Sequence, residues 1–406
     1  MTEPFRCRLT LCLLLASPIV FADAPVASAE DDASVRFDAL YTGDLWQNTH
    51  GGVRTGGKFI GDLDLALQID GERAWGLDGV TLFANGLFVH GGSVSGPLVG
   101  DAQTLSNIEA DHQSRLFELW VEKRFGHDKS PSLRVGLYDL NSEFDVIDTA
   151  TLFVNSSHGI GPQIAQTGLN GPSIFPVTSL AARLHWSLPQ QWSAQFAVMD
   201  GVPGDPDRPT SNAVRLDSKD GLLLIAEAGR AGSRLKKVAV GAWRYTARFD
   251  EVAPPDSEAA PARVRGNAGF YAVLDAQLYS EAADANQGLS GFLRLGNADD
   301  RINRFKNFAG AGLVYTGALA WRPQDQLGLA VASVGNGRPY RLANELAGIA
   351  SDARELAVEL TYRFAVNDWL TLQGDVQHVA NPNTNPDIPN ATAVALRFDI
   401  QRTFWR

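Results

Sequence analysis

Charged, amide and aromatic side chains recur at every second position of several short segments. Glu118, Trp120 and Glu122 alternate with apolar residues, and Arg134 and Tyr138 occupy two such positions in the next segment. These groups supply hydrogen-bond donors, acceptors and aromatic ring faces. Because both signs of charge are present, the pattern favours hydrogen bonding to neutral, polyhydroxylated solutes over selection of one kind of ion.

Apolar positions of a membrane strand must face lipid, so the polar positions between them face the inside. On this basis we expect a solute-contacting inner wall made of Asp64, Glu118, Trp120, Glu122, Arg134, Tyr138, Arg183, Arg294, Glu359, Gln373 and Arg397. The same rule places Arg244 and Arg248 inside and Phe117 outside. The alternative for each charged residue is a salt-bridge network that only stabilises the wall.

Catalysis would require a nucleophile and a base held close together. The best local candidate is Ser156-Ser157-His158, but adjacent loop residues rarely form a working pair and no third member is evident. We therefore predict that the chain is not an enzyme. No metal-ligand spacing and no phosphate-binding glycine loop stands out, so we predict no cofactor.

The elements that must position these side chains are β-strands. Leu356, Val358 and Leu360 alternate with Ala357 and Glu359, as in a strand with one apolar and one polar face. About sixteen such segments are expected, at roughly 35–46, 58–70, 80–90, 115–125, 132–140, 179–188, 192–200, 221–229, 236–249, 267–279, 288–297, 308–321, 325–334, 354–365, 369–378 and 391–402.

The connections between these segments favour an all-β fold, a transmembrane antiparallel β-barrel. They are long after odd-numbered strands and short after even-numbered ones, which is typical of outer-membrane barrels and has no cause in a soluble β-sandwich. About sixteen strands enclose an aqueous channel. Tryptophans expected at the periplasmic interface lie beside the short turns or at the C-terminus: Trp75, Trp186, Trp192, Trp321, Trp369 and Trp405.

The first residues resemble a secretory leader. Arg6 and Arg8 precede an apolar stretch too short to span a bilayer, and small residues allow cleavage after residue 22 or as late as residue 29. We expect a signal peptide at 1–22 and a barrel over 30–406; a short membrane anchor is the alternative. The net charge of −11 disfavours nucleic acid as a partner.

One connection, about 141–178, is too long for a simple turn. It contains apolar residues such as Leu152, Phe153 and Phe175, which are unfavourable in open water. We expect this segment to fold into the barrel as a constriction loop. The alternative is a cap on the outer surface.

Several stretches resemble the OprB-type carbohydrate-selective porins of Gram-negative bacteria. They are 136–145 (GLYDLNSEFD) with 152–162 (LFVNSSHGIGP), 200–204 (DGVPG), and 359–362, 369–373 and 375–377 followed by Asn381-Pro382. His158 stands where an aromatic residue is expected, and Gly374 stands where proline is common. The resemblance implies an outer-membrane channel, monomeric or trimeric, that favours glucose-like sugars and is surrounded by outer-membrane lipid. A porin for another small polar solute and an adhesin or receptor barrel are the alternatives.

Overall fold

A closed β-barrel forms the body of this chain in a computed structural model that describes residues 33–126, 129–253, 261–282, 284–319 and 321–405. Each barrel strand pairs antiparallel with its neighbours, and β1 closes the sheet against β18. The barrel strands are β1 (Val35–His50), β2 (Gly56–Asp70), β3 (Val80–Gly91), β4 (Gln113–Arg124), β5 (Ser132–Tyr138), β6 (Ser179–Leu188), β7 (Trp192–Asp200), β8 (Leu222–Arg230), β9 (Lys237–Tyr245), β12 (Ala268–Ser280), β13 (Gly288–Ala298), β14 (Phe305–Thr316), β15 (Gln326–Asn336), β16 (Arg354–Asn367), β17 (Leu370–Ala380) and β18 (Ala391–Trp405).

The described strands confirm the predicted sixteen-stranded antiparallel barrel. The predicted signal peptide lies outside the described residues. Helices in the described residues are short: α1 (Gly71–Trp75), α2 (Ser156–Gly159), α3 (Pro162–Ala165) and α4 (Arg338–Leu346), with single helical turns at Ser95–Val99, Leu140–Ser142, Asp148–Leu152, Pro189–Gln191 and Pro382–Thr384. Among them, none is long and apolar enough to cross a bilayer.

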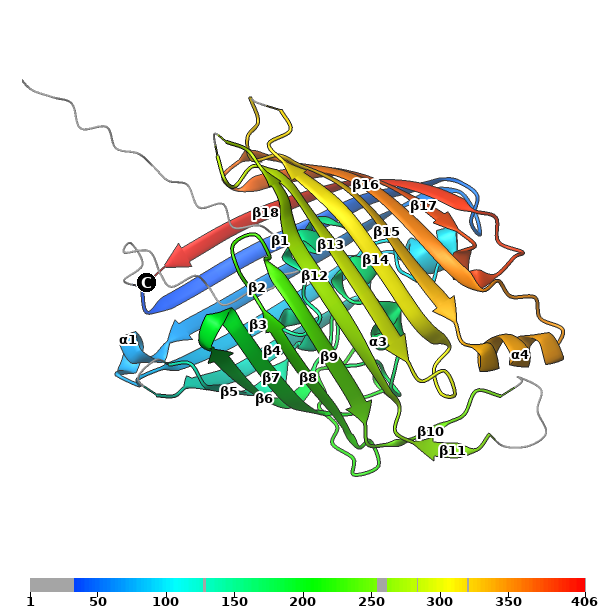
Figure 1. Ribbon diagram of the computed structural model, residues 1–406, viewed down its shortest axis with the longest axis horizontal. Coiled ribbons are helices and arrows are strands. Elements are labelled where there is room, and N and C mark those ends of the chain that lie inside the picture. Colours follow the sequence, from blue (N-terminus) through cyan, green and yellow to red (C-terminus); the bar gives the residue numbers. More distant parts are fainter. Residues whose placement is uncertain (1–32, 127–128, 254–260, 283, 320, 406) are drawn as a thin grey trace, which may run out of the picture.

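The two ends of the barrel differ (Figure 1). The start of β1, the end of β18 and α1 lie at the left, whereas α4 and the small hairpin of β10 (Arg248–Asp250) and β11 (Arg263–Arg265) lie at the right. Long connections follow odd-numbered barrel strands, as predicted, with exceptions at 51–55 and 299–304. Those two are short because β1 continues to His50 and β14 begins at Phe305. Strand pairing therefore includes residues that were expected to lie in loops.

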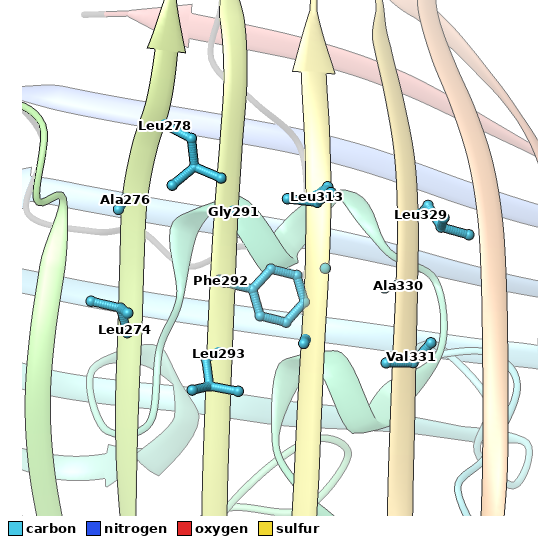
Figure 2. Close-up of a pocket in the computed structure, with 12 residues that line it drawn as sticks. Leu274, Ala276, Leu278, Gly291, Phe292, Leu293, Leu313, Leu329, Ala330 and Val331 are labelled. Carbon is cyan, nitrogen blue, oxygen red and sulfur yellow. The ribbon is translucent and has the colours of Figure 1, made fainter.

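The two faces of the sheet alternate along β12 to β15, as Figure 2 shows around a shallow apolar depression of the outer face. Leu274, Leu293 and Leu313 are exposed, whereas Phe292 and Ala330 are buried on the inner side. Since lipid tails are the natural neighbours of an apolar outer face, this alternation gives the barrel its membrane-facing band.

Three predicted facings are wrong. A register shift between Asn85 and Gly86 adds one residue to β4, and this bulge turns Phe117 inward, where it is buried. Arg244 is exposed on the outer face, while its neighbour Trp243 is buried inside. Arg248 belongs to the β10–β11 hairpin beyond the barrel. The apolar-outside rule fails in β9 because an internal loop packs against the inner wall there.

Candidate functional site

The connection between β5 and β6, residues 139–178 and here called the inner loop, is held against the inner wall of the barrel by carboxylates that accept its backbone N–H groups. Glu359 accepts from Val154 N at 2.6 Å and from Asn155 N at 3.1 Å. Asp275 accepts from the backbone N and the hydroxyl of Thr149, at 2.9 and 2.6 Å. Apart from the bond to the Thr149 hydroxyl, these charge-assisted bonds fix the backbone of the loop rather than its side chains.

Two further carboxylates repeat the pattern on other strands. Glu118 accepts from Asp139 N at 3.1 Å, where the inner loop leaves β5. Glu227 accepts from Asp145 N at 3.0 Å and from the Tyr271 hydroxyl at 2.8 Å. Anchors on β4, β8, β12 and β16 therefore hold the loop from widely separated parts of the barrel circumference.

Arg294 of β13 makes the complementary contact. Its Nε donates to Asp145 Oδ1 at 3.0 Å, and its terminal nitrogens donate to the backbone carbonyls of Asp145, Ser157, His158 and Gly159 at 2.6–3.1 Å. The Arg294 side chain is 1% exposed. The planar guanidinium of Arg294 therefore binds two turns of the inner loop at the same time.

His158 packs as an aromatic ring. Its centroid lies 5.0 Å from that of Phe153 and 5.9 Å from that of Phe292. Burial, and then the charge of Arg294, lower its pKa to about 3, so the imidazole is neutral. The hydroxyl of the adjacent Ser157 donates to the carbonyl of Gln103 at 3.3 Å and not to the ring. The geometry is therefore that of a packed loop and not of a nucleophile–base pair.

A second connection, residues 92–112 between β3 and β4 and here called the second loop, is anchored on β16 and β18. Arg397 donates to both carboxylate oxygens of Asp44, at 2.7 and 2.8 Å, and to Asn107 Oδ1 at 2.9 Å. Glu355 accepts from Ala102 N at 2.8 Å. The wall thus fixes this loop as it fixes the inner loop.

A charge network connects β4, β5 and β6 to the inner loop. Arg183 Nη2 lies 2.7 Å from Glu122 Oε2 and 2.6 Å from Glu143 Oε1, and Arg134 Nη2 lies 2.9 Å from Glu122 Oε2. Tyr138 donates its hydroxyl hydrogen to Glu143. Although burial raises the pKa of Glu143, the two arginines hold it below its usual range. The carboxylate therefore stays charged and the network stays intact near neutral pH.

Aromatic rings stand next to this network. Trp120 stacks on Phe83 with ring centroids 4.9 Å apart, and the guanidinium carbon of Arg134 lies 3.8 Å from the Trp120 ring centroid. Nearby on β2 and β3, Asp62 Oδ1 and Asn85 Oδ1 accept no hydrogen bond from the described residues. Both acceptor atoms are buried, and Trp120 and Arg134 are each 8% exposed, so a solute beside these strands would meet only small parts of the ring and the cation.

Most of the predicted wall residues serve the loops in the structure. Those with a hydrogen bond or ion pair to the inner or second loop are Glu118, Arg134, Tyr138, Arg183, Arg294, Glu359, Gln373 and Arg397. Within the described residues, those without one are Asp64, Trp120 and Glu122. Binding of solute by any of them stays a prediction.

Sequence reasoning missed anchors that the structure reveals, notably Glu227 and Glu355. Glu355 shares the inner face of β16 with Glu359, Thr361 and Arg363, whereas Glu227 is a lone carboxylate on the inner face of β8, which is otherwise apolar on that face. That isolation was an available signal, because an unpaired carboxylate there would be costly. Among the described residues, no group of three or more histidine, cysteine, aspartate or glutamate side chains could hold a metal ion.

The sequence model of the OprB carbohydrate-selective porin family matches residues 54–401. A curated relative is Porin B of Pseudomonas aeruginosa, which is 24% identical over 405 residues and covers 91% of this chain and 87% of that protein.

Solved structures agree on the fold. The high-pH structure of Pseudomonas putida OprB has a TM-score of 0.82 at 20% identity, covering 91% of this chain and 94% of that one. The outer-membrane channel DcaP of Acinetobacter baumannii is more distant, with a TM-score of 0.53 at 11% identity over 92% of this chain and 99% of that one.

Proposed function

The chain belongs to the OprB family of carbohydrate-selective porins, and we propose that the solutes it favours are monosaccharides such as glucose. It is a channel of the outer membrane and not an enzyme. The choice of monosaccharide rests on the inner wall, where a ring face stands beside groups that can donate and accept hydrogen bonds.

The observation that carries this proposal is the stack of Phe83 and Trp120 with Arg134 over it. A sugar has weakly polar C–H faces that pack on an aromatic ring and hydroxyl groups around its edge that need partners. Asp64, on the same inner face of the neighbouring strand β2, is partly exposed and offers carboxylate oxygens as acceptors. These acceptors replace water lost by the sugar and lower the barrier to passage.

We also propose that the inner loop narrows the pore. Its support is the set of wall-to-backbone hydrogen bonds, which keep the loop inside the barrel rather than over its mouth. The buried apolar residues of the loop, from Leu140 to Ile164, pack in one cluster with residues of the inner wall. Solute passage is thereby confined to the part of the lumen that the loop leaves open.

Sugar-induced block of single-channel current in planar bilayers tests the proposal. We expect glucose to bind with millimolar affinity, about −4 kcal/mol, because binding must remain weak enough for release. Trp120→Ala and Arg134→Ala should weaken the block, whereas Leu119→Ala, on the lipid-facing side of the same strand, should not. Equal block in all three variants would refute the assigned solute path. Stronger block by a sugar acid than by glucose would replace the neutral monosaccharide with a charged solute.

The oligomeric state, monomer or trimer, and the signal peptide at 1–22 stay predictions.

A further inference from the structure

Two arginines that sequence parity places inside the pore lie outside it, and they need another partner. Arg244 is the outward residue at the outer end of β9, and Arg248 continues the same exposed face into the β10–β11 hairpin. Arg248 pairs directly across that hairpin with Arg265, which is also exposed. Figure 1 shows this hairpin beyond the rim of the barrel, at the end opposite α1.

This arrangement concentrates positive charge in an acidic chain. Like charges directly opposite each other across a strand pair are destabilising. The guanidinium of Arg244 lies against Gly266, next to Arg265 in the chain. Within the described residues, the three guanidinium groups have no carboxylate partner, because Asp250 pairs with Arg263 at 3.2 Å instead. We call Arg244, Arg248 and Arg265 the rim arginines.

The position of the rim arginines identifies the kind of partner. Arg244 pairs with Ala268, one outward position beyond Phe270, which is 58% exposed on the lipid-facing side. The apolar band therefore ends and the cations begin within one pair of residues. Arg248 lies four residues further, about 13 Å along an extended strand. This is the depth at which lipid headgroups meet a membrane protein.

We propose that the rim arginines bind the phosphate groups of phosphorylated lipids in the outer leaflet. Guanidinium groups bind phosphate oxygens through two parallel N–H bonds, and a phosphate placed between them would relieve the repulsion of Arg248 and Arg265. The acyl chains of the same lipid would cover the apolar band that includes Phe270. Both halves of such a lipid thus have a matching surface on the β9–β12 side of the barrel.

Native mass spectrometry of the purified barrel in detergent, with bisphosphorylated lipid A as the probe, tests this proposal. We expect the double variant Arg244→Gln/Arg265→Gln to lose affinity by about tenfold or more, since each arginine near a headgroup contributes on the order of 1 kcal/mol. The control Arg230→Gln/Arg402→Gln removes two exposed, outward arginines from the other end of the barrel and should change nothing.

Two further arms separate the sources of phosphate. Monophosphorylated lipid A should bind more weakly to the parent protein, and inorganic phosphate should not displace the lipid, because it lacks acyl chains. Equal lipid affinity in both double variants would overturn the proposal, as would full displacement by inorganic phosphate. Unchanged single-channel conductance in the Arg244→Gln/Arg265→Gln variant would show that its barrel is folded; altered conductance would place these arginines in the pore and would also overturn it.

Discussion

Replacing Arg294 with glutamine should loosen the inner loop from the wall of the barrel. The change removes a buried cation from Asp145 and from the carbonyls of Ser157, His158 and Gly159. Breaking a buried ion pair by removing one partner costs about 3–5 kcal/mol. The ratio of undocked to docked loop should therefore rise roughly 10²- to 10⁴-fold. Single-channel recordings should show larger or noisier current, and glucose should block it less.

The effect should depend on pH through Asp145, which lies on the inner loop. Burial raises the pKa of this carboxyl from 3.8 to about 6, even though Arg294 acts to lower it. A folded-state pKa above the unfolded one means that docking weakens as pH rises through this interval. Without Arg294 the pKa should rise further, so at pH 5 the carboxyl is neutral and no unpaired charge is buried. The variant should be closer to the parent at pH 5 than at pH 8.

Leu293→Ala is the matched control, since it truncates the exposed, lipid-facing neighbour on the same strand. The double variant Arg294→Gln/Asp145→Asn should recover part of the loss, because it removes the stranded carboxylate. If Arg294→Gln keeps the conductance, current noise and thermal stability of Leu293→Ala at both pH values, the loop does not depend on this anchor.

Three other outcomes are expected. Gly328→Val should push the inner loop away and raise conductance, because a Cβ at this position would lie 2.7 Å from Leu152 Cδ2. The control Gly374→Val should leave conductance unchanged, because no atom lies within 4 Å of a Cβ there. Equal conductance in the two variants would contradict the packing of the loop against β15. Glu359→Ala should lower the temperature at which the barrel unfolds on a heat-modifiability gel. The change leaves two loop N–H groups, including that of Val154, without a hydrogen-bond acceptor, at a cost of about 1–3 kcal/mol each. An unchanged temperature would mean that water replaces the carboxylate. Purified mature protein should conduct in a planar bilayer without any energy source, and a silent bilayer with folded protein would argue against an open pore.

The strands could be predicted from sequence because lipid imposes a strict period of two on them. Leu356, Val358 and Leu360 contact one environment along their whole strand, so alternation locates both the strand and its faces. The pattern fails where the inside also becomes apolar. Trp243 and Tyr245 point inward to meet the inner loop, and their outward neighbour Arg244 then looked like a lumen residue.

The candidate site was harder to predict than the fold. Parity correctly places Glu118, Glu359 and Arg294 on the inner wall, but it contains no information on what they contact there. Apart from the Asp145 carboxylate that pairs with Arg294, their partners in the loops are backbone N–H and carbonyl groups, which every loop sequence carries alike. The chemistry of these side chains therefore predicts contacts with solute, whereas in the structure the same side chains anchor the loops. The bulge at Phe117 could not be predicted either, because a bulge changes how β4 pairs with β3 and not which residues β4 contains.

Anchoring through backbone atoms has a consequence for how such channels diversify. Glu359, Asp275 and Arg294 hold the inner loop by atoms that mutation of a loop side chain does not remove. Selection can therefore exchange the side chains that border the solute while the same attachment points persist. The wall of the barrel therefore provides fixed attachment points for the loop. Loops with a similar backbone course and different side chains could be exchanged at these points, by evolution or by design, without changes in the wall.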